Sequence, residues 1–296
     1  MRVTVTGATG RIGSLLVDRL RERGDEVTIL SRSEREGTVK WDPAARPAPS
    51  DALRGRDAVI HLAGEDVAQR WSASTKERIR DSREIGTRNL VAGLRGVPDD
   101  VRPHVLVSGS ASGYYGPRGD ERVGESEGPG NDFLAEVCVA WEAEARAAES
   151  LGMRVARIRT GIVLDKDGGA LAKMLPPFKL GVGGPVASGR QWMPWIHRDD
   201  EVGLMLAAVD GKAWSGPINA SAPNPVTNRD FSKALGRALH RPAIAPVPAL
   251  AIRMLYGEMA SIVTSGVRMV PKRALELGYA FAHPDLDEAL SSALAQ

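Results

Sequence analysis

Short apolar runs alternate with longer amphipathic stretches over the first half of the chain. Runs rich in β-branched residues predict strands at Arg2–Thr6, Glu26–Ser31, Ala58–Leu62, His104–Val107 and Arg154–Arg159. Apolar residues at helical spacing predict helices at Ile12–Arg23, around Trp71–Leu94 and at Phe133–Ser150. This order is typical of βαβ units. It predicts an α/β fold of the Rossmann type, a doubly wound parallel sheet with its ligand crevice at the carboxyl ends of the strands.

The pattern changes after Leu164. Residues 165–189 are rich in glycine and proline, a short strand-like run follows at Pro217–Ala220, and mostly helical sequence continues to the end. We therefore predict a Rossmann domain at 1–164 and a smaller, mostly helical substrate-facing or lid section at 165–296. Residues 190–222 are expected to return to the Rossmann sheet.

The last part of the chain carries an apolar stripe at helical spacing, which needs a partner surface. We therefore expect the C-terminal section to close the cofactor crevice by packing this stripe against it. Its members are Met254, Leu255, Met259, Ile262, Val263 and Val267.

A glycine-rich loop joins the first strand to the first helix. Gly7 permits a tight turn, Gly10 allows the backbone to approach a pyrophosphate, and Gly13 allows the helix to pack close to the strand. The helix N-terminus supplies free N–H groups and the positive end of its dipole. The spacing is Gly-x-x-Gly-x-x-Gly. The predicted dinucleotide contacts from this loop are Gly7, Thr9, Gly10, Arg11, Ile12 and Gly13.

The end of the second strand indicates which dinucleotide is preferred. An NAD site places a carboxylate there for the ribose 2′-hydroxyl, whereas this chain has Ser31 and Arg32. Arg32 can pair with a 2′-phosphate, and Arg11 can add a second positive charge. We therefore expect NADP(H) as the cofactor. Binding of S-adenosylmethionine is a weaker alternative, since such sites usually also have an acid at this position.

Composition and charge argue against several other kinds of partner and site. The 296 residues carry 39 Lys and Arg against 37 Asp and Glu, with 43% hydrophobic residues, so nucleic acid and membranes are not expected partners. The single cysteine cannot form an internal disulfide, and the five histidines lie far apart in sequence, so no metal site is expected. We expect a cytoplasmic protein with a small-molecule substrate, and a homodimer stays open.

Several segments together resemble the extended short-chain dehydrogenase/reductase superfamily, the NAD-dependent epimerase/dehydratase group. These are Asp57–Gly64, Gly86–Leu90, Ser108–Ser110 with Tyr114–Gly116, and Trp195–Asp200. The resemblance implies that Leu62, Ala63 and Gly64 run past the cofactor. Further segments resemble a subfamily of sugar-nucleotide epimerases with an extra C-terminal domain of unknown function. These are Trp41–Pro43, Leu62–Glu65, Arg80–Arg83, Arg159–Leu164, and the tail from Pro271–Arg273 to Pro284–Leu286.

One part of the superfamily pattern is missing. Its members use a serine with a tyrosine and a lysine four residues apart on the following helix, where the lysine lowers the tyrosine pKa for proton exchange. The corresponding helix here contains neither residue. Aligning Glu142 with the family's glutamate places Leu134 at the tyrosine position and Cys138 at the lysine position. Arg83 stands where many relatives have an asparagine.

The remaining candidates for proton transfer are hydroxyl groups after the fourth predicted strand. Ser110 is the first choice for the active-site hydroxyl, with Ser112 next, and Tyr114 or Tyr115 can replace the missing acid. A serine that caps the strand and an aromatic pair that walls the pocket are the structural alternatives. We expect an NADP(H)-dependent oxidoreductase acting on a small carbonyl or sugar-like substrate. A sugar-nucleotide epimerase or dehydratase and a non-catalytic NADP(H)-binding regulatory protein stay open.

Overall fold

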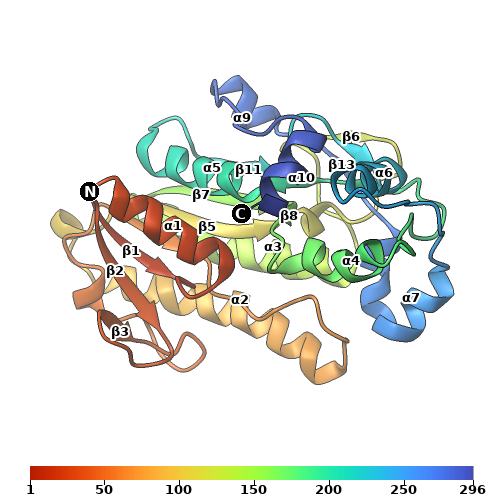
Figure 1. Cartoon of the computed structure of the whole chain (residues 1–296). Coiled ribbons are helices and arrows are strands. Elements are labelled where there is room, and N and C mark those ends of the chain that lie inside the picture. Colours follow the sequence, from red (N-terminus) through yellow and green to blue (C-terminus); the bar gives the residue numbers. More distant parts are fainter. Residues whose placement is uncertain (296) are drawn as a thin grey trace.

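A seven-stranded parallel sheet forms the centre of the computed structural model, which describes residues 1–295 (Figure 1). The strand order is β11-β7-β5-β4-β1-β2-β3, so the chain reverses direction across the sheet between β1 and β4. The predicted Rossmann-type α/β fold is therefore confirmed. The strands are β1 (Arg2–Thr6), β2 (Glu26–Ser31), β3 (Thr38–Lys40), β4 (Ala58–His61), β5 (Val105–Ala111), β7 (Arg154–Thr160) and β11 (Gly216–Ala220).

Some boundaries differ from those expected. The sequence did not indicate β3, which has only three residues and is half-buried or exposed. Strand β5 continues to Ala111, because its polar residues Ser108 and Ser110 are buried between neighbouring strands. Strand β11 pairs with β7 at the edge of the sheet. The domain boundary after Leu164 stays a prediction.

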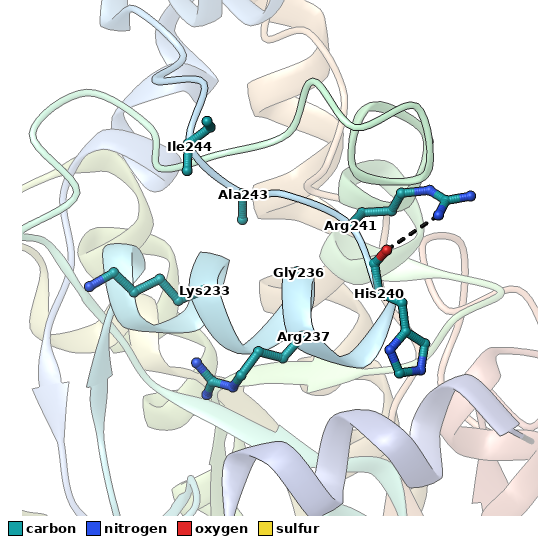
Figure 2. A pocket seen from close by; sticks show the side chains of 7 residues that line it. All are labelled: Lys233, Gly236, Arg237, His240, Arg241, Ala243 and Ile244. Carbon is teal, nitrogen blue, oxygen red and sulfur yellow. Dashed lines mark hydrogen bonds between the residues drawn. The ribbon is translucent and has the colours of Figure 1, made fainter.

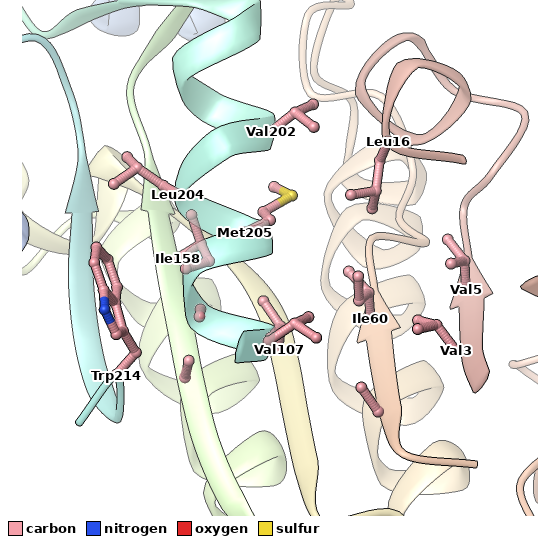
Figure 3. Packing of buried hydrophobic residues seen from close by; sticks show 14 of the residues in the cluster. Val3, Val5, Leu16, Ile60, Val107, Ile158, Val202, Leu204, Met205 and Trp214 are labelled. Atoms are coloured by element: carbon pink, nitrogen blue, oxygen red, sulfur yellow. The ribbon is translucent and has the colours of Figure 1, made fainter. Parts of the chain in front are cut away.

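Helices cover both faces of the sheet because the central strands are apolar on both sides (Figure 1). Helices α1 and α5 pack on one face and α2 and α3 on the other. Alternate residues of a strand pack in different layers: Val107 packs on the α1 and α5 side (Figure 3). Leu106 packs on the α2 side. The bounds are α1 (Arg11–Glu22), α2 (Ala73–Arg95), α3 (Phe133–Arg146) and α5 (Arg198–Asp210).

The second section has its own apolar cluster, in which Phe231 of α6 and Leu290 of α10 are fully buried. Its helices are α4 (Gly169–Lys179), α6 (Asn228–Ala238), α7 (Ala249–Tyr256), α8 (Ala260–Thr264), α9 (Lys272–Glu276) and α10 (Leu286–Ala295). Two-stranded pairs join β8 (Ile162–Leu164) to β10 (Trp195–His197), β9 (Trp192–Met193) to β12 (Val226–Thr227), and β6 (Arg122–Val123) to β13 (Arg268–Met269). Short 3₁₀ helices occupy Ser50–Ala52, Asp99–Val101, Ser112–Tyr115, Ala147–Leu151 and Gly257–Met259.

The expected C-terminal apolar stripe does not form one packed face. The chain breaks between α7 and α8 at Gly257, whose φ of 63° ends the first helix. Met254 and Leu255 are 69% and 66% exposed, whereas Met259 and Val267 are buried. The expectation that the whole stripe closes the crevice is therefore wrong, because the stripe residues belong to separate segments of the chain, α7 and α8 among them, and not to one continuous helix. Within residues 1–295, no helix is long and apolar enough to span a membrane.

Candidate functional site

The glycine loop after β1 is shaped by contacts that leave no room for side chains. Gly7 has a φ of 73°, and a Cβ placed on it would lie 2.7 Å from the carbonyl carbon of Leu62. A Cβ on Gly13 would lie 2.2 Å from the Gly7 carbonyl oxygen. The first and third glycines thus allow α1 to start directly behind the loop and close to β4. These contacts fix the backbone of the loop in which the pyrophosphate cradle is predicted.

The N-terminus of α1 is available to an anion. Gly10 is its N-cap residue, no side chain caps it, and its first turn contains no acidic residue. The helix dipole and the first-turn N–H groups therefore stay uncompensated at this end. Arg11, which is expected to add charge for the cofactor, also contacts the second section: its Nη2 donates to the Asp167 carbonyl, and its side chain packs on Gly168. Arg11 thus links α1 to the second section.

A buried hydrogen-bond chain fixes the loop after β4. The Thr6 hydroxyl lies 2.7 Å from His61 Nδ1 and accepts from the backbone N–H groups of Leu62 and Ala63. Thr6 therefore donates to His61, whose Nε2 then donates to the Thr87 hydroxyl at 3.1 Å. Burial lowers the pKa of His61 to about 4, so the ring is neutral near pH 7. This chain holds Leu62 and Ala63 against Gly7.

The predicted selectivity residues lie at the carboxyl end of β2. Ser31 is half-buried, and its hydroxyl accepts from the Ser33 N–H at 3.2 Å. Arg32 is exposed and makes no hydrogen bond or ion pair with any part of the chain that the structure describes. Its guanidinium is thus available to a ligand at the β2 end.

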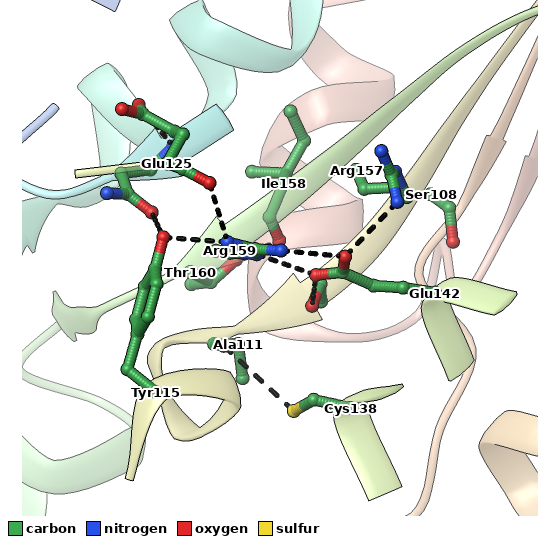
Figure 4. A network of polar contacts seen from close by, with 12 residues as sticks. Ser108, Ala111, Tyr115, Glu125, Cys138, Glu142, Arg157, Ile158, Arg159 and Thr160 are labelled. Carbon is green, nitrogen blue, oxygen red and sulfur yellow. Dashed lines mark hydrogen bonds and ion pairs between the residues drawn. The ribbon is translucent and has the colours of Figure 1, made fainter. Parts of the chain in front are cut away.

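Ser110 is buried near the end of β5, beside the charged network of Glu142, Arg157 and Arg159 that Figure 4 shows. Its hydroxyl donates to Glu142 Oε1 at 2.7 Å, and Arg159 donates to both carboxylate oxygens of Glu142 at 2.8 and 3.0 Å. Arg157 approaches the same carboxylate at 3.4 Å. The bidentate pair joins α3 to β7, so Ser110 is committed to structure within the chain.

The two adjacent tyrosines have different surroundings. Tyr115 is fully buried, donates to Asn219 Oδ1 at 2.7 Å and accepts from Arg159 at 2.8 Å (Figure 4). Burial raises the pKa of Tyr115 to about 12, so it stays protonated near neutral pH. Tyr114 is half-buried with its ring 3.5 Å from the Arg159 guanidinium carbon, and no hydrogen bond from its hydroxyl to residues 1–295 is formed.

A family model, the NAD dependent epimerase/dehydratase family, matches residues 3–219, which is most of the chain. The chain belongs to this family. A second model, a domain of unknown function, matches residues 247–293. The recognised superfamily and the extra C-terminal domain are thereby both confirmed.

Relatives of similar length occur in distant organisms. The chain is 41% identical to the chloroplastic homologue of epimerase family protein SDR39U1 from Arabidopsis thaliana, covering 98% of this chain and 86% of that protein. It is 36% identical to the human SDR39U1 protein, covering both chains fully. Human SDR39U1 crystallised with NADPH superposes with a TM-score of 0.91, at 34% identity and over the whole of both chains.

Another solved structure has a longer chain. A nucleoside-diphosphate sugar epimerase from Corynebacterium glutamicum superposes with a TM-score of 0.80 at 36% identity. The match covers 99% of this chain and 58% of that one. More distant neighbours, such as MoeE5 with UDP-glucose and NAD at 21% identity, share the fold.

The two α3 residues that the alignment through Glu142 puts at the tyrosine and lysine positions, Leu134 and Cys138, lie close to the end of β5. A Cβ on Gly113 would lie 3.2 Å from Leu134 Cβ and 3.9 Å from Cys138 Sγ, so both α3 residues face the end of β5. Burial raises the pKa of Cys138 to about 12, which makes its thiol a poor nucleophile. Ser112, beside Gly113, is half-buried and makes no hydrogen bond through its hydroxyl in the described part of the chain. Ser112 and Tyr114 are therefore the uncommitted hydroxyls here.

A pocket of about 640 Å³ lies apart from these residues (Figure 2). It is formed by α6 and the segment after it, and Lys233, Arg237 and Arg241 contribute basic side chains. Arg237 forms a bidentate pair with Asp287 of α10, at 2.7 and 2.8 Å. No member of the predicted cofactor site lines this pocket.

His197 connects the sheet to the C-terminal section. Its Nδ1 accepts from the Asp199 N–H at the start of α5, and its ring stacks on His283 with centroids 3.7 Å apart. Potential ligand atoms of His197, Asp199 and His283 lie within 4.8 Å of one another, which the separation in sequence did not indicate. The capping bond and the stacking identify His197 as a junction residue.

Proposed function

We propose that the chain binds NADP(H) at the carboxyl end of its sheet and acts as an oxidoreductase of the extended short-chain dehydrogenase/reductase type. The observation that carries the proposal is the glycine cradle with an uncapped helix behind it, next to an unpaired Arg32 where an NAD site would have an acid. The NADPH in the human relative's structure supports the choice of dinucleotide. Arg32 is proposed to pair with the 2′-phosphate, while Gly10, Ile12 and Gly13 face the pyrophosphate.

Calorimetric titration with NADPH and NADH tests this assignment. Replacing Arg32 removes a charge-assisted hydrogen bond to the phosphate, so Arg32→Ala should reduce the preference for NADPH by about 1–3 kcal/mol. Arg35→Ala, three residues further along the same loop, is the control and should leave the preference unchanged. An Arg32→Ala protein with the wild-type preference would contradict the assignment.

The proposed reaction is reduction of a small carbonyl or sugar-like compound. Bound NADPH would supply a hydride to the carbonyl carbon, and the carbonyl oxygen would take a proton from a nearby hydroxyl. Tyr114 is the proposed proton donor and Ser112 the proposed hydrogen-bond donor, because both hydroxyls are uncommitted. The sequence favoured Ser110 over Ser112 and offered Tyr114 and Tyr115 equally, whereas the hydroxyls of Ser110 and Tyr115 are hydrogen-bonded within the chain. Their burial and mutual network support a positioning role for both.

A sugar-nucleotide epimerase is the second candidate, favoured by the 36% identical relative from Corynebacterium glutamicum. Epimerisation needs a base that first removes a proton from a sugar hydroxyl. The alignment through Glu142 puts Leu134 and Cys138 at the positions of the family's tyrosine and lysine, and neither can do this. Reduction needs only a proton donor, and we therefore favour it. A non-catalytic NADP(H)-binding regulator would keep the cradle and Arg32 but transfer no hydride.

Transfer of deuterium from C4-labelled NADPH to a panel of carbonyl compounds and nucleotide sugars separates these functions. We expect slow stereospecific transfer that falls at least tenfold in Tyr114→Phe and Ser112→Ala, with unchanged NADPH affinity. Ser110→Ala should instead lower thermal stability. Rapid epimerisation of a nucleotide sugar would establish the second candidate, and complete inertness of a protein that binds NADPH would favour the regulator.

A further inference from the structure

Arg83 is half-buried beside the loop that follows β4. It projects from α2, and its Nη1 donates to the carbonyl oxygens of Glu65 at 3.0 Å and Ile79 at 3.2 Å. A Cβ on Gly64 would lie 3.3 Å from the Arg83 Cζ. The guanidinium is thus held flat against a residue of the predicted cofactor loop.

The charge of Arg83 has no carboxylate partner. No acidic oxygen within residues 1–295 lies within 4.0 Å of its nitrogens, although Glu65 and Asp66 act on it from further away. Burial lowers the pKa of Arg83, but a guanidinium stays charged near neutral pH. Burying a cation without an ion pair is unfavourable. A ligand oxygen would relieve that cost.

Part of the guanidinium is also unused. All hydrogen bonds that Arg83 makes with the described chain come from Nη1, which leaves the N–H groups of Nε and Nη2 without a partner. Neither atom is among the fully buried nitrogens that lack a partner, so both stay reachable from solvent. Arg83 therefore presents free donors at an accessible position while its other end is fixed.

The strand order decides which end of a dinucleotide these donors meet. Strand β2, which carries Arg32, lies on one side of β1, and β4 and β5 lie on the other. Arg83 contacts Gly64 after β4, and its Cζ lies 5.1 Å from the ring centre of Trp141, which packs on Gly109 of β5. With the pyrophosphate at the β1 loop and the adenosine toward β2, the nicotinamide half extends toward Arg83.

We propose that Arg83 binds the ribose of the nicotinamide half, donating from Nε and Nη2 to its hydroxyl oxygens. This proposal rests on the proposed binding of NADP(H). Arg83 would then place a fixed positive charge beside the nicotinamide, where hydride transfer would occur. This charge comes from α2, whereas the family's lysine would lie on α3. Arg32 and Arg83 would then hold opposite ends of one cofactor.

The experiment compares a whole cofactor with its adenosine half. Calorimetry measures the affinities of NADPH and of adenosine 2′,5′-bisphosphate for the full chain and its variants. Arg83→Gln should weaken NADPH by about tenfold and leave the bisphosphate unchanged, which corresponds to about 1.4 kcal/mol. Arg83→Lys keeps the charge but has fewer directed donors, so its NADPH affinity should lie between those of the wild type and Arg83→Gln. Arg32→Ala should weaken both ligands.

Arg80→Gln is the matched control, because Arg80 lies on the same helix, is 48% exposed at its side chain and lies 3.7 Å from Glu136. It should change neither affinity. Unchanged NADPH binding in Arg83→Gln, or equal loss of both ligands with a lowered melting temperature, would overturn the proposal. A wild-type chain that binds neither ligand would instead refute the proposed cofactor itself, so the two failures are distinguishable.

Discussion

Arg159 is an arginine with almost no exposure, and its surroundings explain how the chain tolerates that charge. Glu142 accepts from it at two oxygens, Tyr115 accepts from Nη1, and the Tyr114 ring covers the guanidinium. Every neighbour thus either neutralises the charge or satisfies one of its donors. Such a network is stabilising only while it is complete, since removal of one partner leaves a buried charge.

Glu142→Ala tests this dependence. We expect a loss of about 3–5 kcal/mol in the free energy of unfolding, because Arg159 would be left buried without its carboxylate. Glu144→Ala removes a carboxylate that pairs with the exposed Arg88, and it should cost about 1 kcal/mol or less. Urea denaturation of both variants measures the difference. The double variant Glu142→Gln, Arg159→Met should recover part of the loss; equal costs for the two alanine variants would contradict the argument.

Helix α5 shows how an element can carry a charge-bearing group into the core. The helix packs on the sheet through Val202, Leu204 and Met205, and this places Glu201 of the same turn in a fully buried position. Glu201 Oε1 accepts from the Thr160 hydroxyl at 2.7 Å, and Oε2 has no partner among the described residues. Burial raises the pKa of Glu201 to about 8.

This raised pKa predicts a loss of stability with rising pH. Between about pH 4.5 and 8 the folded chain keeps a proton on Glu201 that the unfolded chain releases, so the free energy of unfolding falls as pH rises. The lowered pKa values of His61 and His197 act in the opposite direction, but mostly below pH 6.5, the ordinary histidine pKa, above which the unfolded chain also loses these protons. From pH 6.5 to 8 the fall should therefore be roughly 1–2 kcal/mol. Glu201→Gln should flatten this dependence in denaturation curves. An equal slope in wild type and variant would exclude Glu201 as its source.

At the scale of the whole molecule, Asp200 joins the Rossmann sheet to the C-terminal section. Its Oδ1 accepts from the Ala282 N–H at 2.7 Å and its Oδ2 from the His283 N–H at 2.9 Å. Tyr279 donates to the Asp200 carbonyl at 3.3 Å. One buried carboxylate thus holds a segment about eighty residues later in sequence against α5.

Asp200→Asn should loosen that junction selectively. An amide presents an NH2 group where the carboxylate has its second acceptor oxygen, so one backbone N–H would lose its partner, at a cost of about 1–3 kcal/mol. Hydrogen exchange at Ala282 and His283 should become faster while exchange in β4 and β5 stays slow. Asp210→Asn, at an exposed pair with Arg23, is the control. Unchanged exchange at these two amides would show that other contacts hold the section.

Much of the sheet could be predicted from sequence because its signals are local. Strand β1, the glycine loop and α1 follow each other without a gap, so β-branched residues, glycine spacing and helical periodicity all indicate the same unit. The absence of an acid at Ser31 and Arg32 is equally local. Strand β3 was missed because three half-exposed residues carry too little pattern, and the stripe after Met254 was misjudged because periodicity alone does not locate a helix break.

The sequence by itself determined the order of the longer strands and helices of the Rossmann part, the place of the glycine loop and the absence of a Tyr-Lys pair, since each depends on residues close together in the chain. Only the tertiary structure decided which candidate hydroxyls are hydrogen-bonded within the chain and which are available to a substrate. Ser110 donates to Glu142, which lies 32 residues later in the sequence, and Tyr115 accepts from Arg159, which lies 44 residues later. Glu142 and Arg159, which pair with each other, are 17 residues apart. Arg83 likewise gained its unpaired charge through folding, because the burial and hydrogen bonding of a side chain depend on segments that only the packed sheet brings together.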